Sequence, residues 1–408
     1  MPSPRRRAWG LVVGAALLFT VGTSVQAGWL LALASALLGA VIAGSLLPVR
    51  MVSGLEVERR APGEAFQGDE VAVELVVVNR GRGVRLGLEI DDAHLGRTRV
   101  AVPSLAPGER AVIGTMRRAS RRGANESSAV AVRSSAPFGV AERRRSLVLP
   151  GSTLVFPKVV RLEALPLVDA LSTREHAMHA APRRGAGPEY FGIREYRTGD
   201  SMRHVHWAST ARHAQLMVRE FEHERTRRLA IVLDTWADAG EEDTPLDACC
   251  SAAASVAFAA LGRGRGVRLL AASDGRVERL TRAEPKRVLE WLADLRPFGG
   301  LAFADLVRAL GPELRGVETV LLVLPTWRAN APERLAEAAG GLREAAARVA
   351  ALLVEADSFE PDRRGPALAP EEVDALERAL AGRGVETYRI RMGEDLAECL
   401  SRPLARAG

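Results

Sequence analysis

Residues 229–238 read LAIVLDTWAD, five consecutive apolar residues followed by Asp234. A short apolar run that ends at a polar loop is typical of a strand buried on both faces. The pattern recurs at residues 267–272 and at 317–324, which read VETVLLVL. Strands covered on both faces belong to sheets that lie between layers of helices, so this part of the chain predicts an α/β fold.

Amphipathic and alanine-rich segments separate these strands. We expect strands and helices to alternate over residues 226–408 as a doubly wound sheet. The expected strands are 229–233, 267–272, 317–324, 350–355 and 385–391, and the expected helices are 246–261, 284–296, 303–310, 331–348, 370–382 and 394–401.

Asp234 follows the first of these strands, where open α/β sheets bind ligands. The run from Asp234 to Asp238 resembles the metal-ion-dependent adhesion site of von Willebrand factor A domains, whose pattern is Asp-x-Ser-x-Ser. Here Trp236 and Asp238 occupy the two serine positions, and Trp236 offers no oxygen to a hard cation such as Mg²⁺. We therefore expect a degenerate site without a cofactor, with Asp234 and Asp238 as the candidate metal ligands of this loop.

Two uncharged apolar segments, residues 9–25 and 29–49, lie near the N-terminus. Each is long enough to cross about 30 Å of hydrocarbon as a helix, so residues 1–50 predict a transmembrane helical hairpin. Three arginines at positions 5–7 precede the pair and Arg50 follows it. The positive-inside rule then places both ends, and all later residues, in the cytoplasm beside the cell membrane.

A cleaved signal peptide over residues 1–28 is the alternative interpretation of this N-terminus. The second apolar segment argues against it, because cleavage would still leave a membrane anchor.

Residues 51–160 alternate between apolar and polar side chains and are divided by Gly, Pro and Asn turns. This pattern predicts an immunoglobulin-like antiparallel β-sandwich. The inward-facing positions that we expect include 71, 73, 75 and 77, then 86, 88 and 90, then 100 and 102, 130 and 132, and 147 and 149.

Residues 161–225 connect the two patterns and contain a dense mixture of Arg, Glu, His and aromatic residues. We expect a helix over 201–212 with Asp200 as its N-cap and Trp207 facing inward. We expect a strand over 215–224 that pairs with the first strand of the α/β region. The segment then serves either as a salt-bridged structural joint or as a docking surface for a charged partner.

This connecting segment carries a family resemblance. It contains Gly187, Phe191-Gly192, Arg194-Glu195-Tyr196, Gly199-Asp200, Arg203, Trp207, Ala211-Arg212, Leu216 and Val218-Arg219-Glu220. Farther upstream are Arg121-Arg122-Gly123 and Pro137-Phe138-Gly139. These residues resemble the signature and the upstream elements of the family called domain of unknown function 58. The chain departs from the pattern at Ala136 and His206, where the family usually has acidic residues. The signature and candidate docking residues are Arg194, Tyr196, Gly199, Asp200, Arg203, Trp207, Arg212, Arg219 and Glu220.

The resemblance implies a membrane-anchored bacterial protein with a degenerate A-type domain and no established catalytic residues. It further implies work with a MoxR-type AAA+ ATPase, and with other membrane or A-domain proteins, in protein assembly, maturation or envelope stress. We expect a non-enzymatic scaffold or adaptor. The alternatives are a metal-dependent binding protein that uses Asp234 and Asp238, and an unrecognised hydrolase that uses the histidines.

The composition, and the spacing of the histidines and cysteines, limit the partners and the metal sites that we expect. The net charge of +6 over 408 residues is mostly arginine, and no aromatic-interleaved basic module accompanies it, so nucleic acid is not an expected partner. His204 and His206 are two residues apart and diverge on a helix, which disfavours a zinc site formed by them with His176 or His179. The three cysteines, Cys249, Cys250 and Cys399, lack metal-ligand spacing and are expected to be buried and reduced.

Overall fold

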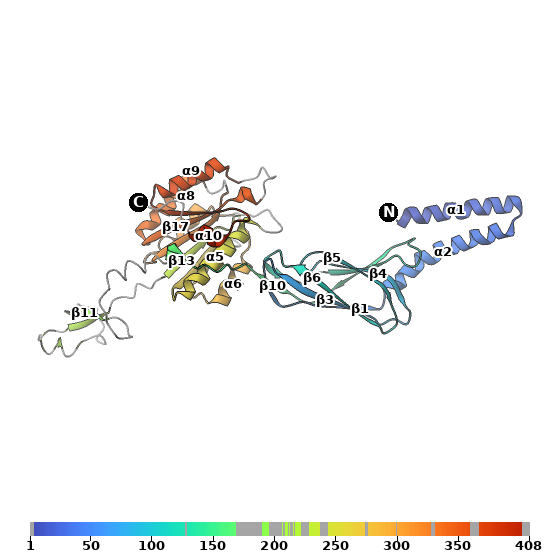
Figure 1. Cartoon of the computed structure of the whole chain (residues 1–408), viewed down its shortest axis with the longest axis horizontal. Coiled ribbons are helices and arrows are strands. Elements are labelled where there is room, and N and C mark those ends of the chain that lie inside the picture. Colours follow the sequence, from blue (N-terminus) through green and yellow to red (C-terminus); the bar gives the residue numbers. More distant parts are fainter. Residues whose placement is uncertain are drawn as a thin grey trace. The chain divides into compact units, whose positions relative to one another are not determined.

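The computed structural model divides the chain into two compact units, residues 1–156 and 157–408. Figure 1 shows their elements along the chain. The structure describes residues 4–126, 129–168, 190–195, 206, 209–210, 212, 215, 217–221, 228–236, 244–273, 276–298, 300–327, 331–359 and 367–401.

Two long apolar helices open the first unit. Helix α1 spans Pro4–Val25 and α2 spans Gly28–Val52, and both are long and apolar enough to cross a membrane. A turn at Gln26, with φ of 53°, reverses the chain between them. The helices approach closely there, since a Cβ added to Gly22 would lie 3.0 Å from Leu30 Cβ. The expected apolar hairpin is confirmed and indicates membrane anchoring.

The rest of the first unit is built from strands in three sheets. The first has the order β1-β3-β6, the second β5-β4-β8-β9 and the third β2-β10-β7. The strand bounds are β1 Leu55–Arg60, β2 Glu64–Phe66, β3 Glu70–Asn79, β4 Arg85–Asp92, β5 Thr98–Leu105, β6 Arg110–Arg118, β7 Gly123–Asn125, β8 Ala129–Ser134, β9 Arg143–Val148 and β10 Thr153–Phe156.

The first two sheets share one apolar core. Leu75 and Val77 of β3 belong to the same buried cluster as Leu88 and Ile90 of β4 and Val132 of β8. The alternation expected in β3 is therefore confirmed. The third sheet departs from a wholly antiparallel arrangement, because β10 runs parallel to β2 and antiparallel to β7.

Leu86 was expected to face inward with Leu88 and Ile90, and this expectation is wrong. The Leu86 side chain is 38% exposed. Gly87 has a φ of 54°, in the left-handed region that glycine adopts most readily. This residue interrupts the regular pleat of β4, so the side chain before it no longer follows the inward-facing set.

A buried ionic cluster joins the strands of the first unit. The Asp92 carboxylate, fully buried, accepts hydrogen bonds from Arg59 Nη2 at 2.7 Å and from Arg117 Nη1 at 2.8 Å. Arg117 Nη1 also donates to the His94 carbonyl oxygen at 2.7 Å. The His94 ring lies 3.0 Å from Thr153 Oγ1, which donates to the Pro62 carbonyl oxygen. One carboxylate therefore holds two guanidinium groups in the interior.

His94 makes the stability of the first unit depend on pH. Burial lowers the pKa of His94 below its ordinary 6.5; Arg59 and Arg117 act in the same direction and Asp92 opposes them. Between about pH 6.5 and the lower pKa of the folded state, the unfolded chain binds more protons than the folded chain, so stability is lost as the pH falls through that range. We expect a loss of up to about 1.4 kcal/mol for each pH unit within that range.

Thermal unfolding of the full chain in detergent between pH 7.5 and 5.5 measures this loss. The variant His94→Gln removes the titrating group, so its melting temperature should change less over the same range. Equal pH slopes for the two proteins would contradict the assignment.

The second unit contains a six-stranded sheet of order β15-β14-β13-β16-β17-β18. Each strand pairs in parallel with its neighbour, except that β15 is antiparallel to β14. The central strand, β16, is buried at all its positions. The bounds are β13 Arg228–Leu233, β14 Gly266–Ser273, β15 Arg276–Leu280, β16 Thr319–Pro325, β17 Arg348–Val354 and β18 Glu386–Ile390.

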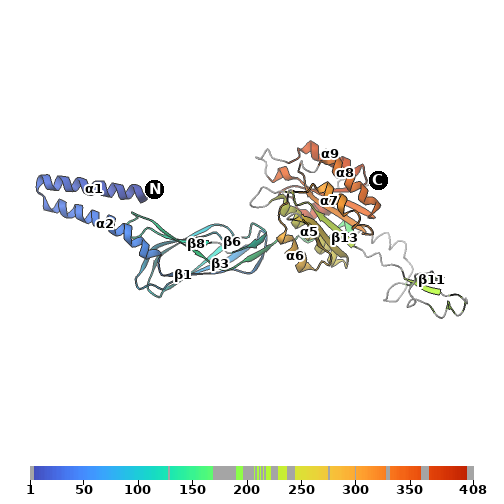
Figure 2. The same cartoon turned by 180° about the vertical axis from the view of Figure 1, so that it is seen from behind.

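Helices cover this sheet on both faces (Figures 1 and 2). One buried cluster packs α7, α8 and α9 against residues such as Ala230 and Leu322. On the other face α5 contacts β13, β14, β16 and α6. The bounds are α5 Pro245–Gly262, α6 Pro285–Asp294, α7 Phe303–Leu310, α8 Pro332–Gly341, α9 Pro370–Ala381 and α10 Leu396–Ser401. The expected α/β architecture is confirmed, with one antiparallel edge strand that the sequence analysis did not include.

The helix expected over 331–348 is too long. Helix α8 ends at Gly341, a 3₁₀ turn covers Leu342–Glu344, and Arg348 begins β17. Gly340 and Gly341 have low helix propensity, which favours an end at this point.

Helix α5 is apolar enough to count as a third candidate membrane span by composition, yet 67% of that window is buried inside the unit. Its start is fixed by a capping box, in which Thr244 Oγ1 accepts from the Asp247 backbone N–H at 3.1 Å and Asp247 accepts from the Thr244 N–H at 3.1 Å. The tertiary contacts identify α5 as a core helix of the sheet.

The three thiols are all reduced in this structure. Cys249 and Cys250 are buried in α5, as expected. Cys399 in α10 is only half-buried, so the expectation of full burial is wrong for this residue.

Cys399 should be a poor nucleophile despite its partial exposure. Burial raises the pKa of its thiol from 9.0 to about 11, with help from the nearby carboxylate of Glu394. At pH 8 its thiolate fraction is then about a hundredfold lower than that of an ordinary thiol. We expect its alkylation by iodoacetamide to keep accelerating up to about pH 11, and Glu394→Gln to accelerate it. A rate that levels off near pH 9 would contradict this.

Candidate functional site

Two strands of the connecting segment form a two-stranded antiparallel sheet. Strand β11, Tyr190–Glu195, pairs antiparallel with β12, Met217–Phe221. In this register Arg194 is opposite Val218, Arg219 opposite Ile193, and Glu220 opposite Gly192. Three of the signature residues therefore lie on two adjacent strands.

The expected pairing of this region with the α/β sheet is wrong. Strand β12 pairs with β11, and the two neighbours of β13 are β14 and β16. The apolar run of β13 is fully enclosed by parallel neighbours, which leaves no edge for a strand from the connecting segment.

The expected helix over 201–212 is also wrong at His206. This residue lies outside the helix, and its backbone N–H donates to the Met217 carbonyl oxygen at 2.8 Å. Its Nδ1 accepts from the Ser209 backbone N–H at 3.2 Å, as an N-capping side chain does, and the described helical residues begin at Ser209. His206 therefore has a structural role here, and Arg212, which is helical, is exposed.

Several predicted positions lie outside the described residues. Among the signature residues these are Tyr196, Gly199, Asp200, Arg203 and Trp207. The same is true of the second candidate metal ligand and of the histidines weighed for zinc, namely Asp238, His176, His179 and His204.

Asp234 lies at the carboxyl edge of the six-stranded sheet, between the neighbouring strands β13 and β16. From β13 the next strands, β14 and β15, are added on one side of the sheet, whereas β16, β17 and β18 are added on the other. Such a switch point is the usual ligand site of open α/β sheets. Asp234 is 3% exposed, its N–H donates to the Val323 carbonyl oxygen at 2.9 Å, and its Oδ1 accepts from the Trp236 N–H at 2.9 Å. The carboxylate therefore organises the loop that follows the strand.

The chemistry of this loop fits a divalent cation poorly. Thr235 donates its hydroxyl hydrogen to the Ala272 carbonyl oxygen, and its own carbonyl oxygen accepts from the Phe298 N–H at 2.5 Å. Trp236 brings no oxygen side chain. Within the described ranges, no three His, Cys, Asp or Glu side chains gather as a metal-binding group.

Farther along the same edge, Glu355 follows β17 and forms a second polar cluster. Its carboxylate accepts from Arg391 Nε at 2.9 Å and also bonds to Arg389, which contacts Asp374 at 2.8 Å. Burial works against the charge of Arg389, but the hydrogen bonds that it donates to Asp374 and Glu355 raise its pKa overall. These charged side chains are paired with one another, and their ion pairs link the carboxyl ends of β17 and β18.

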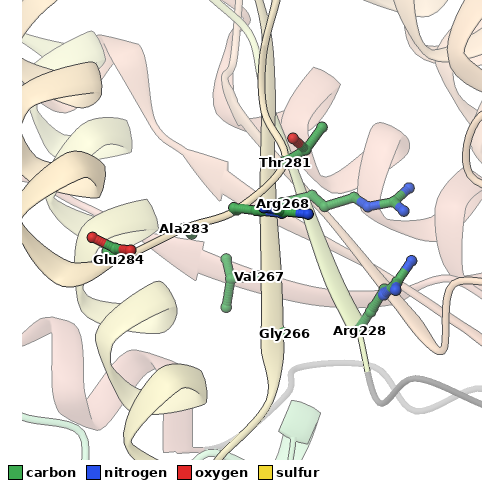
Figure 3. A pocket seen from close by; sticks show the side chains of 8 residues that line it. Arg228, Gly266, Val267, Arg268, Thr281, Ala283 and Glu284 are labelled. Carbon is green, nitrogen blue, oxygen red and sulfur yellow. The ribbon is translucent and has the colours of Figure 1, made fainter. Parts of the chain in front are cut away.

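A shallow arginine-lined pocket lies at the opposite, amino end of β13 and β14 (Figure 3). It has a volume of about 440 Å³. Arg228 and Arg268 extend to one side of β14 in Figure 3, and Glu284 lies on the other side. Thr281 and Arg282, just after β15, complete the polar lining. Sequence analysis did not identify this cluster, because its arginines come from three separate parts of the chain.

Comparisons with known proteins give one family and weak structural likenesses. No curated protein matches the chain. Among solved structures, it is similar to a beta-glucosidase from Listeria innocua (16% identity, TM-score 0.14, 24% of this chain and 16% of that chain). It is also similar to the alkylpurine DNA glycosylase AlkC of Pseudomonas fluorescens bound to DNA (11%, 0.14, 34% and 46%).

A third similarity is to the GH20 exo beta-N-acetylglucosaminidase of Vibrio harveyi (10% identity, TM-score 0.20, 86% of this chain and 59% of that chain). The chain thus spans less than two thirds of each of these three proteins. Likenesses at such TM-scores carry no argument about fold or activity.

The family model described as "Protein of unknown function DUF58" matches residues 192–383. The matched region begins in β11, contains β12 and continues through strands β13 to β17 to just past the end of α9, so that β18 and α10 lie outside it. It includes the signature positions from Arg194 to Glu220 on which the resemblance rests. This match supports assignment of the chain to the DUF58 family.

Proposed function

We propose that this protein is a membrane-anchored, non-enzymatic adaptor that presents its folded units to a MoxR-type AAA+ ATPase in protein assembly, maturation or envelope stress. The observation that carries the proposal is the apolar hairpin of α1 and α2 joined to two folded units, one of which bears the DUF58 signature. The family resemblance supports the identity of the partner.

The charges that flank the hairpin support a cytoplasmic position for both units. Arginines 5–7 lie in the first turn of α1 and Arg50 lies in the last turn of α2. Both ends of the hairpin therefore carry positive charge on the same side, which the positive-inside rule assigns to the cytoplasm. An AAA+ ATPase would meet the adaptor there, where ATP is available.

The signature region is the proposed contact with the ATPase. Arg212 is exposed and precedes β12 by a few residues, and its positive charge suits an acidic surface on the partner. We expect formaldehyde crosslinking in native membranes, followed by mass spectrometry, to recover a MoxR-type ATPase with the full chain. The variant Arg212→Glu should reduce that recovery severalfold, because it places like charges opposite each other.

The matched control is Arg315→Glu, a change of the same charge at an exposed arginine of the same unit outside the signature. It should leave the recovery unchanged. Failure to crosslink any AAA+ ATPase with the wild-type chain would remove the proposal's main support, and equal loss in both variants would remove the proposed contact.

A second candidate is a von Willebrand factor A-like domain that binds protein through a cation. The position of Asp234 at the switch point favours it. Calorimetric titration of the full chain with Mg²⁺ and Mn²⁺ distinguishes the adaptor function from the cation-dependent function. The adaptor proposal expects no binding heat, whereas heat that disappears in Asp234→Asn would favour the cation-dependent function.

A further inference from the structure

The sheets of the first unit make direct contact with α2 well before that helix ends. Helix α2 contacts β4, β8 and β9. The loop between β8 and β9, residues 135–142, lies against Gly44, where an added Cβ would be 3.0 Å from Val140 Cβ and 3.4 Å from Phe138 Cβ. Gly44 is thus the close-approach point between helix and loop.

The position of Gly44 along the hairpin places this contact inside the apolar span. Gly44 precedes Arg50 by six residues, or about 9 Å along a helix axis. Gly22 of α1 faces Leu30 and Leu31 of α2, so equal steps along the antiparallel pair bring Arg6 level with residues 46–47. Gly44 lies about 3–5 Å deeper than that level. The loop therefore reaches the boundary between headgroups and acyl chains.

The side chains around this contact are apolar and exposed. Phe138 is 52% exposed and Leu86 is 38% exposed. The Leu86 N–H donates to Met51 Sδ at 3.4 Å, so this residue lies beside the last turn of α2. An aqueous surface would disfavour such a group, whereas the boundary of the hydrocarbon favours it.

Basic side chains follow directly behind the loop. Arg143 and Arg144 begin the edge strand β9, opposite Ser134 and Arg133, and both are exposed. Glu142 is the nearby acidic residue, and its carboxylate lies 3.8 Å from Arg133. Arginines just outside the hydrocarbon match the phosphates of anionic lipids.

We propose that residues 135–140 form a membrane-inserted wedge. Phe138 enters the acyl boundary of the bilayer that α1 and α2 span, and Arg143 and Arg144 contact lipid phosphates. The wedge holds the first unit against the membrane surface. This inference does not depend on the ATPase partner or on which side of the membrane the unit lies.

Spin-label accessibility in the full chain tests the wedge. Phe138→Cys is labelled with a nitroxide and reconstituted into vesicles of phosphatidylcholine and phosphatidylglycerol at about 3:1. Met116→Cys is the control, because Met116 is 61% exposed. It lies six residues along β6 from Arg110, at the end of the sheet that is farther from α2. Labelled wild type gives the background from native thiols.

We expect the ratio of collisions with oxygen to collisions with a water-soluble nickel chelate to be severalfold higher at position 138 than at 116. Equal ratios would place the loop in water, and protection from both reagents would show a covering protein; either result overturns the proposal. In mixed vesicles, Arg143→Glu combined with Arg144→Glu should lower the ratio at 138, and in pure phosphatidylcholine it should not. No fall in mixed vesicles would overturn the phosphate contact.

Discussion

Asp92→Ala should destabilise the first unit by about 3–5 kcal/mol, because it leaves two buried guanidinium groups without their shared carboxylate. The side chains of Arg59 and Arg117 are each 2% exposed, so water cannot replace the lost partner. Hydrogen exchange of the full chain, followed by mass spectrometry, should show faster exchange in β4 and in its neighbour β8, since exchange resolves the stability of one region at a time.

Glu56→Ala is the matched control for this change. Glu56 accepts from Arg80 at 2.7 Å, the same distance as the Asp92–Arg59 pair, but both side chains are more than half exposed. Solvent-exposed pairs contribute about 0–1 kcal/mol. Similar exchange rates in the two variants would show that the buried cluster does not hold the unit together.

Gly44→Leu should separate the loop of residues 135–142 from α2. The added side chain would occupy the space of Val140 and Phe138, and overpacking of this kind costs about 1–3 kcal/mol. We expect faster hydrogen exchange in the loop and a lower oxygen-to-nickel collision ratio for a label at position 138.

Gly39→Leu is the control on the same helix, since a Cβ added to Gly39 meets no atom within 4 Å. It should leave both measurements unchanged. If Gly44→Leu also leaves them unchanged, then the loop does not depend on its contact with α2.

The α/β sheet could be predicted because its signal is local. Five apolar residues before Asp234 and the continuous run in β16 identify strands without knowledge of their neighbours. The strand β15 was missed because its sequence, RVERL, is mostly polar, and only its pairing with β14 makes it a strand. The exposure of Leu86 depends on one positive φ at Gly87, which alternation alone does not reveal.

The candidate sites were harder to predict because they depend on tertiary structure. A charged segment such as 161–225 predicts polar contacts but not their partners, so the pairing of β12 with β11 and the capping role of His206 became evident only in the structure. The cluster around Asp92 brings together Arg59, Arg117 and His94 from different strands and loops. The pattern of charges along the sequence does not show which distant residues come together in the folded chain.

Helix α5 has a consequence for how the chain is synthesised. Its mean hydropathy of 1.4 is below the 2.3 of α2 but within the range of membrane-spanning helices, so membrane insertion competes with folding during synthesis. Strand β16, which packs on α5 in the finished unit, begins 57 residues after Gly262. The ribosome synthesises about 5–20 residues per second, so several seconds pass between the synthesis of α5 and that of β16. The abundance of alanine over leucine in α5, and Asp247 in its first turn, lower its tendency to insert into a membrane and still leave it apolar enough for the core.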